Sequence, residues 1–115
     1  MRDKIFISDI VKKVDAMMLY QGEQDYVRWV VSSGLMSDVL TTEETEILLV
    51  SSLSTTQVVR TADMVGANAI LLCCGKPVMM DTMKLAEELG ITLLSTAYPV
   101  FETCMLLSPM FQKEK

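Results

Sequence analysis

Three short runs of the sequence are apolar at almost every position, and segments of helical periodicity alternate with them. The runs cover residues 47–50, 69–74 and 91–94. Segments 54–66 and 81–90 repeat apolar side chains at helical spacing and end in glycine, which is typical of a helix C-terminus. Strands that are apolar on both faces belong to a parallel sheet with helices on both sides. The pattern predicts an α/β fold of three layers, with a mainly parallel sheet flanked by helices.

The amino-terminal part of the chain predicts shorter elements. Residues 8–14 are expected to form a helix and residues 16–20 a strand. The β-branched and aromatic run 26–31 predicts one further strand, with every second side chain from Val27 on one face. Residues 35–40 then predict one or two turns of helix.

Side-chain capping signals mark the starts of three predicted helices. They are Ser8, Ser54 (in a capping box with Gln57) and Asp81. A last helix is predicted after Pro99, with Phe101 and Met105 facing inward and Leu106 as a further candidate. The helices therefore alternate with the strands, as right-handed crossovers between parallel strands require.

Length and apolar content narrow the class of protein. The 115 residues suffice for one domain, and 50% of them are hydrophobic, which is rich for so small a unit. A small domain cannot hide all of this material in its own core. We therefore expect a homodimer that buries an apolar face, with a dense core as the simpler alternative.

Charge and cysteine content argue against several partners. The net charge is −5 and the basic residues are scattered, so nucleic-acid binding is not expected. No run approaches the roughly 18 apolar residues of a membrane span, and the first ten residues carry charges where a signal peptide is apolar. Three cysteines, two of them adjacent, form no disulfide framework and suit a reducing compartment, so we expect a cytoplasmic protein.

The sequence lacks the residues of common catalytic sites. It has no histidine, so neither a Ser-His-Asp nor a Cys-His arrangement can form. Gly75-Lys76 follows a strand as in a phosphate-binding loop, but Pro77 stands where that loop needs a hydroxyl and Ile70 where it needs its first glycine. Adjacent Cys73 and Cys74 point to opposite sides of a strand, so they cannot both bind zinc. We predict no catalytic residue, no metal ligand and no cofactor.

Small polar residues follow the predicted strands where each ends. They are Ser33, Ser51, Ser54, Thr55, Gly75, Lys76, Ser95 and Thr96. The carboxyl ends of parallel strands lie side by side, and each leads to a helix N-terminus with free N–H groups. This arrangement suits a small anion, so these eight residues form the candidate ligand site. Helix capping is the competing explanation, because caps use the same residue types.

Two stretches of the chain resemble the DRTGG-domain family. Residues 30–40, VVSSGLMSDVL, are similar to the family's strand and Leu-Leu-Ser-Asp-Val-Met type of helix. Residues 66–102, GANAILLCCGKPVMMDTMKLAEELGITLLSTAYPVFE, follow its pattern of strand, Gly-containing turn, helix and Ile-Pro-Leu-Leu-Ser-Thr type of strand. The resemblance extends over about residues 8–107 and implies that 1–115 is a single DRTGG-like domain. It also implies a fold related to the N-terminal, non-catalytic domain of HPr kinase/phosphorylase.

The chain departs from the family's pattern at several positions. The naming pentapeptide is absent, and its region holds Asp25, Arg28 and the run Trp29-Val30-Val31 in place of paired glycines. Gly34 stands where many members have an acid. The segment 53–57 replaces one that often contains His and Asn, so family sites built on these positions do not carry over.

The resemblance implies a non-catalytic regulatory or interaction domain that acts beside metabolic or signalling enzymes. Members also occur as inserts in CBS-containing family II inorganic pyrophosphatases. We expect a homodimer that senses a small anionic or nucleotide ligand at the strand C-termini. Two alternatives stay open: a small enzyme acting on a phosphorylated or acyl substrate at the same place, with Lys76 or Ser33 essential, and a redox sensor that uses Cys74.

Overall fold

The computed structural model of the chain describes residues 2–111, and its centre is a five-stranded sheet. In spatial order the strands are β2 (Met17–Tyr20), β7 (Thr92–Ser95), β6 (Ala69–Leu72), β5 (Ile47–Ser51) and β4 (Trp29–Ser32). The last four are parallel, whereas β2 runs antiparallel to β7. A separate two-stranded antiparallel sheet pairs β1 (Ile5–Phe6) with β3 (Tyr26–Val27).

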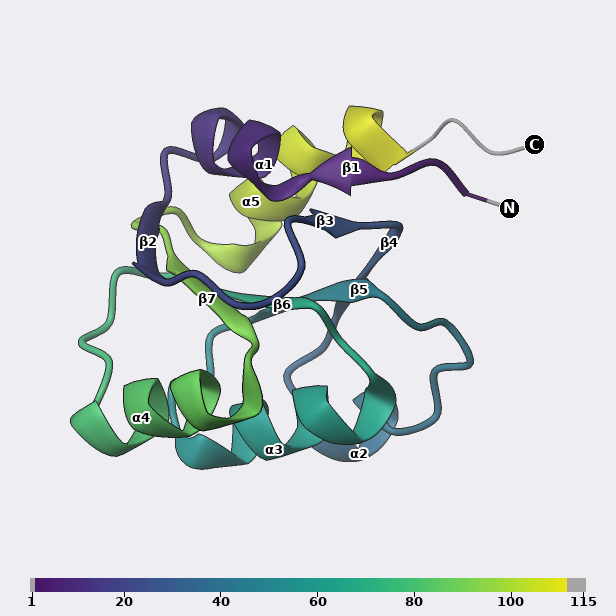
Figure 1. Cartoon of the computed structure of the whole chain (residues 1–115). Helices are drawn as coiled ribbons and strands as arrows, with labels where there is room; N and C mark the ends of the chain where they lie inside the picture. Colours follow the sequence, from purple (N-terminus) through teal and green to yellow (C-terminus); the bar gives the residue numbers. More distant parts are fainter. Residues whose placement is uncertain (1, 112–115) are drawn as a thin grey trace.

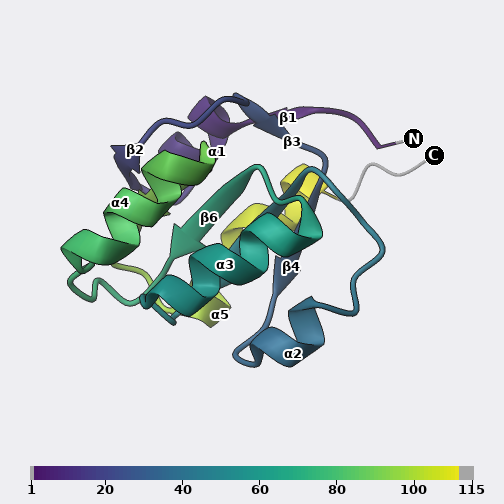
Figure 2. The ribbon, with the colours of Figure 1, turned by 60° about the horizontal axis from the view of Figure 1, so that its bottom comes forward.

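Helices cover both faces of the central sheet (Figure 1). On one face lie α1 (Ile7–Lys13), α5 (Val100–Leu107) and the 3₁₀ helix η1 (Ser108–Phe111). On the other lie α2 (Met36–Val39), α3 (Thr56–Val65) and α4 (Met80–Leu89), which Figure 2 shows from below. This three-layer arrangement confirms the predicted α/β fold with a mainly parallel sheet.

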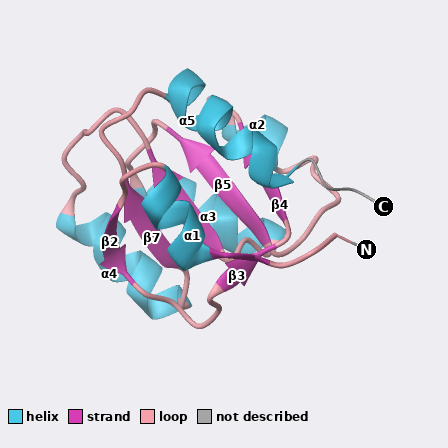
Figure 3. Ribbon diagram, turned by 90° about the horizontal axis from the view of Figure 1, so that it is seen from above, coloured by secondary structure: helices cyan, strands magenta, loops and turns pink. Residues whose placement is uncertain are grey.

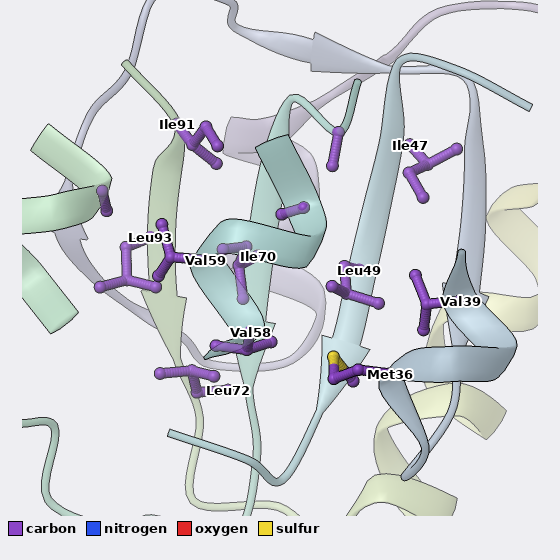
Figure 4. Packing of buried hydrophobic residues seen from close by; sticks show 13 residues of the cluster. Met36, Val39, Ile47, Leu49, Val58, Val59, Ile70, Leu72, Ile91 and Leu93 are labelled. Atoms are coloured by element: carbon purple, nitrogen blue, oxygen red, sulfur yellow. The ribbon is translucent and has the colours of Figure 1, made fainter. Parts of the chain in front are cut away.

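The strand side chains divide the core into two clusters. Along β5, Leu48 and Val50 join the cluster under α1 and α5, whereas Ile47 and Leu49 join the cluster under α2, α3 and α4, and all four are fully buried. Figure 4 shows the second cluster packed between the sheet and the helices. Burial on both faces explains why the central strands are apolar at consecutive positions.

The regular second half of the chain folds as its pattern predicts. The helices α3 and α4 end at Gly66 and Gly90, whose φ angles of 75° and 72° lie in the left-handed region that closes many helices. The short helix α2 and the strand β2 also form within the predicted segments.

The predicted single strand over residues 26–31 is wrong. Arg28 separates β3 from β4, and the two strands belong to different sheets. Val27 is buried under α1, while Val31 packs against the cluster on the other face of the central sheet. The break coincides with contacts to distant parts of the chain, because the Arg28 side chain is held by hydrogen bonds to Glu46 and to the backbone of Arg2.

The predicted side-chain caps are also wrong. The N-cap residues of α1, α3 and α4 are Phe6, Thr55 and Met79, and none of them forms a side-chain capping hydrogen bond. Ser8 and Asp81 lie inside the first turn of their helices. There Asp81 still interacts favourably with the positive end of the helix dipole.

The predicted inward face of the last helix is wrong as well. Phe101 is 77% exposed and Met105 60% exposed, whereas Thr103 and Leu107 are buried and Leu106 packs partly buried against the core. The thiol of Cys73, directly after β6, lies 3.6 Å from the hydroxyl of Thr103. This contact turns the side of α5 that carries Thr103 and Leu107 towards the core. An apolar stripe of α5 is thereby left at the surface.

The two ends of the described chain meet at one corner. Arg2, Arg28 and Phe111 all border a hollow of about 40 Å³ beside the start of β4. The guanidinium of Arg2 lies 3.7 Å from the ring centre of Trp29, and Trp29 in turn makes an edge contact with Phe111. No helix within residues 2–111 is long and apolar enough to span a lipid bilayer.

Candidate functional site

The carboxyl ends of the parallel strands bring several predicted site residues to one edge of the sheet. Ser51 of β5 and Ser95 of β7 both pair with Leu72 of β6, so they flank it on either side. Neighbouring strands lie about 4.8 Å apart, which places the two serines at about twice that spacing. Both belong to the face that α2, α3 and α4 cover. We call the edge formed by Ser33, Ser51, Gly75, Lys76 and Ser95 the rim.

A tight turn after β6 positions the positive charge of the rim. Cys74 and Gly75 are both in the left-handed region, with φ angles of 73° and 62°. Their N–H groups donate to the carbonyl oxygens of Tyr98 at 2.8 Å and Thr96 at 3.0 Å. The turn carries Lys76 back towards β5, where its Nζ lies 3.5 Å from the carbonyl oxygen of Ser52. The ammonium group is exposed, so it is free to meet an anion from solution.

Two predicted site hydroxyls serve local backbone turns. The Oγ of Ser33 accepts from the N–H of Leu35 at 3.0 Å, in the turn between β4 and α2. The Oγ of buried Ser51 accepts from the N–H of Leu53 at 3.1 Å. Each of these oxygens stabilises the chain where it leaves a strand.

The remaining predicted residues lie near the rim but differ in orientation. Thr96 is buried, and its hydroxyl donates to the carbonyl oxygen of Val14 at 2.7 Å, so it fastens α1 on the opposite face of the sheet. The carbonyl of Ser54 accepts from the hydroxyl of Thr82 at 3.0 Å. Thr55 is exposed at the start of α3. The structure therefore groups Ser51, Gly75, Lys76 and Ser95 most closely and directs Thr96 elsewhere.

Helix capping does not account for these polar residues. The N-cap positions of α3, α4 and α5 are Thr55, Met79 and Pro99, and none makes a side-chain bond to the first turn. The first-turn N–H groups of these helices therefore keep their positive partial charge without a side-chain acceptor. Each helix follows a strand that ends at the rim, so all three N-termini lie on that side of the molecule.

The three thiols occupy different environments. Cys73 is buried, Cys104 is partly buried and Cys74 is exposed. Burial is the main cause that raises the pKa of the Cys73 thiol, which keeps this group protonated at neutral pH. Exposure of Cys74 meets the first condition of the redox alternative. Within residues 2–111 no group of three His, Cys, Asp or Glu side chains is placed to hold a metal ion.

A second polar cluster lies at the amino ends of the parallel strands, opposite the rim, and the sequence pattern does not predict it. The hydroxyl of Tyr26 donates to the carboxylate of Glu46, which also accepts from Nε of Arg28 at 2.9 Å. Arg28 continues to the carbonyl oxygen of Arg2 at 2.7 Å, and Arg2 pairs with Glu44 at 2.8 Å. These contacts join segments far apart in sequence, so no local motif marks them.

The carboxylate of Glu46 makes this cluster sensitive to pH. The hydrogen bond from Tyr26 is the main cause that lowers the pKa of Glu46 below its ordinary value of 4.5, and Arg28 adds to the effect. A lowered folded-state pKa stabilises the fold above the ordinary value, and this stabilisation is lost as the pH falls through the folded-state pKa.

We expect Glu46→Gln to lower the melting temperature by a few degrees at pH 7, and we expect this difference to shrink as the pH falls below 4.5 and the wild-type carboxyl takes up a proton. Thermal denaturation of both proteins across this pH range measures the difference. Glu43→Gln is the control, because Glu43 is exposed and close in sequence. A difference that stays the same size throughout acid titration would show that packing, not charge, explains the loss.

A hollow of about 280 Å³ lies between α1 and the end of β2, away from the rim. Its lining residues are Phe6, Ile7, Ser8, Met18, Gln21, Gln24, Asp25 and Thr92. They combine an aromatic ring and a thioether with two amides and one carboxylate. This hollow is a second candidate site for a small ligand, and experiments have to distinguish binding there from binding at the rim.

No model of a known protein family matches the chain, and no curated protein matches it in sequence. Its fold is similar to a crystal structure of the CBS and DRTGG domains from the regulatory region of Clostridium perfringens pyrophosphatase, in complex with the activator diadenosine tetraphosphate. The TM-score is 0.74 at 14% sequence identity, and the match covers 89% of this chain and 45% of that one. The chain thus spans less than half of that protein's length, and the two share a fold.

Proposed function

We propose that this chain is a DRTGG-like regulatory domain that works without catalysis, as a homodimer, and senses a small anionic or nucleotide ligand at the rim. Its partner in a cell is then a metabolic or signalling enzyme whose activity depends on the occupied state. Three unpaired thiols fit the reducing conditions of the cytoplasm, where we place it.

The fold carries this proposal. The similar domains belong to the regulatory region of an enzyme and were crystallised with a nucleotide activator. The phrases SSGLMSDVL and ITLLST, which resemble the DRTGG family, lie where β4 passes into α2 and along β7. The sequence evidence and the fold thus agree in favouring a regulatory module.

Two features of the rim support the proposal of an anionic ligand. Lys76 supplies an exposed positive charge, and three helices without side-chain caps direct their N-termini to the same side. Phosphate groups are bound at such positions because free N–H groups and the helix dipole both favour negative charge. The absence of histidine from the whole sequence removes the commonest general base, which favours recognition over turnover.

The proposal is tested by thermal denaturation of the full chain with diadenosine tetraphosphate, ATP and inorganic phosphate as probes. We expect one of these to raise the melting temperature, since a ligand at a hundredfold excess over its Kd stabilises the folded state by about 2.7 kcal/mol. Lys76→Ala is expected to raise the Kd of that ligand about tenfold, because a hydrogen bond to a charged group is lost. Lys84→Ala on α4 is the matched control, as Lys84 is also exposed.

Three results would contradict the proposal in different ways. Failure of every probe to stabilise the protein would refute nucleotide or phosphate sensing. If the probe still raises the melting temperature of Lys76→Ala, the ligand binds outside the rim. Gln24→Ala would then test the hollow beside β2. Turnover of a phosphorylated or acyl substrate that Lys76→Ala or Ser33→Ala abolishes would favour the enzyme alternative.

A further inference from the structure

The strand β4 leaves one side of the central sheet open. It is the last strand in the sheet order, and β5 is its sole neighbour. Within residues 2–111 no backbone hydrogen bond joins β4 to another segment on its outer side. An open edge presents a row of N–H and C=O groups that another strand is able to pair with.

The register identifies which groups are open. The carbonyl oxygen of Ser51 accepts from the N–H of Cys73, so Ser51 and the alternate residues of β5 face β6. The backbone N–H and C=O groups of Leu48 and Val50 therefore point towards β4. Because Trp29 pairs with Ile47, the backbone groups of Trp29 and Val31 point towards β5. Since successive residues alternate, the N–H and C=O groups of Val30 and Ser32 are the open ones.

Within residues 2–111, the short strand β4 has no charge, proline or bulge that would oppose pairing. Edge strands in monomeric proteins are protected by charged side chains, proline or bulges. The sequence of β4, Trp-Val-Val-Ser, contains neither a charge nor a proline. The opposite edge strand, β2, carries an irregularity in register between Met18 and Tyr20, which blunts that side of the sheet.

Apolar surface lies beside the open edge on both layers. A groove of about 320 Å³ runs between β4 and α5, and its lining includes Val30, Ser32 and Leu107. The neighbouring stripe of α5 exposes Phe101 and Met105. On the other layer Leu35 and Leu40, at the two ends of α2, are 62% and 46% exposed. Seen from above in Figure 3, α5 and α2 both lie near β4, and Figure 1 shows them in the layers above and below the sheet.

We propose that a second copy of this chain pairs with β4 in antiparallel orientation, so that two sheets join into one of ten strands. The two-fold axis passes between Val31 and Val31 of the partner subunit. Val30 then exchanges two backbone hydrogen bonds with Ser32 of the partner subunit. By symmetry, Ser32 exchanges two more with Val30 of the partner subunit. Four hydrogen bonds result, and this register uses every open group of β4. The inference rests on the homodimer in the proposed function and names its interface.

The charges of the chain favour a second copy at this surface. Two copies with a net charge of −5 repel one another, so a contact between them is least opposed where it brings no acidic side chains together. The six residues Val30, Ser32, Leu35, Leu40, Phe101 and Met105, which we call the edge surface, include no ionisable side chain. A two-fold axis brings this neutral surface against itself, as a symmetric dimer requires.

A dimer interface of standard size has to extend beyond β4 itself. A standard interface buries about 800 Å² on each partner, which is roughly an eighth of the 6427 Å² accessible on this chain. The edge surface extends over the open strand and both flanking helices, α2 and α5. Strand pairing then supplies the directional bonds, and the helices supply the apolar area.

The full chain is tested by light scattering and sedimentation over a dilution series. The wild type is expected at twice its 12.8 kDa mass. Ser32→Pro removes two of the four bonds, and we expect it to raise the dimer Kd about thirtyfold. Proline is tolerated there because the N–H faces outward. Ser32→Ala, which keeps the N–H, is the control. Hydrogen exchange at the Val30 and Ser32 amides is expected to slow in the dimer and to quicken on dilution.

A second variant tests the helix surface independently. Phe101→Glu with Met105→Glu places four carboxylates at the two-fold contact and is expected to give a monomer. Met64→Glu is its control, because Met64 is 72% exposed on α3 and lies outside the edge surface. If Ser32→Pro fails to fold, as circular dichroism will show, this variant and the amide exchange decide the question.

The outcomes separate the interface from the proposed function. A wild type that is monomeric at all concentrations overturns the interface and the dimer together. A dimer that withstands both variants, or whose Val30 and Ser32 amides exchange freely, overturns the interface and leaves the regulatory homodimer in place. Dissociation by the helix variant while a folded Ser32→Pro stays dimeric overturns the strand pairing.

Discussion

Shortening Leu71 to alanine is expected to lower the free energy of unfolding by about 3 kcal/mol, because large-to-small changes at buried leucines leave a cavity as well as removing apolar contacts. Leu71 is fully buried in β6, the middle strand, and faces the cluster under α1 and α5. Urea denaturation followed by the fluorescence of Trp29 measures the change.

Met64→Ala is the matched control for this substitution. It removes a side chain of similar size that is 72% exposed, so we expect a change within about 0.5 kcal/mol. Equal losses in the two variants would contradict the assignment of Leu71 to the core.

Adding a single methyl group at Gly22 is expected to destabilise the fold by about 2 kcal/mol, and the melting temperature should fall by about 10 °C. A Cβ atom at this position would lie 2.3 Å from the carbonyl oxygen of Gly90 and 2.6 Å from the backbone nitrogen of Thr92. Both neighbours are backbone atoms, so no side-chain rotation relieves the clash. The Gly22→Ala change also strains the 2.9 Å hydrogen bond from Gly22 N–H to the buried hydroxyl of Thr92.

Gly34→Ala is the control for this second prediction. No atom lies within 4 Å of the position that its Cβ would take, so alanine is expected to be accepted there with little change. Thermal denaturation of the two variants side by side tests the contrast. Similar melting temperatures would mean that the loop after β2 moves away without loss.

Local pattern was sufficient to predict the elements of the second half of the chain. The apolar runs that become β5, β6 and β7 need burial on both faces, and Gly66 and Gly90 supply the left-handed residues that end α3 and α4. These features depend on a few adjacent residues. The fold class therefore follows from local pattern alone.

The errors arose where distant contacts overrule the local pattern. Arg28 divides a run of strand-forming residues because Glu46 and the backbone of Arg2 hold its side chain. The rotation of α5 depends on Thr103 meeting Cys73, thirty residues earlier. Neither partner is visible from the spacing of apolar residues, so a periodicity argument assigns the wrong face.

The candidate site divides along the same line. Parallel pairing alone brings Ser51 and Ser95 to one edge, so the sequence was enough to predict their proximity. The use of individual hydroxyls was not predictable. Thr96 lies on the opposite face by strand alternation, but the partner of its hydroxyl there, the carbonyl oxygen of Val14, is 82 positions away in the sequence.

The corner where Arg2 and Phe111 meet lies at the amino ends of the parallel strands, while the rim lies at their carboxyl ends. Strands of four or five residues separate the two edges by about 15 Å. Because β5, β6 and β7 each run from one of these edges to the other, the strands are the shortest covalent path between the two places.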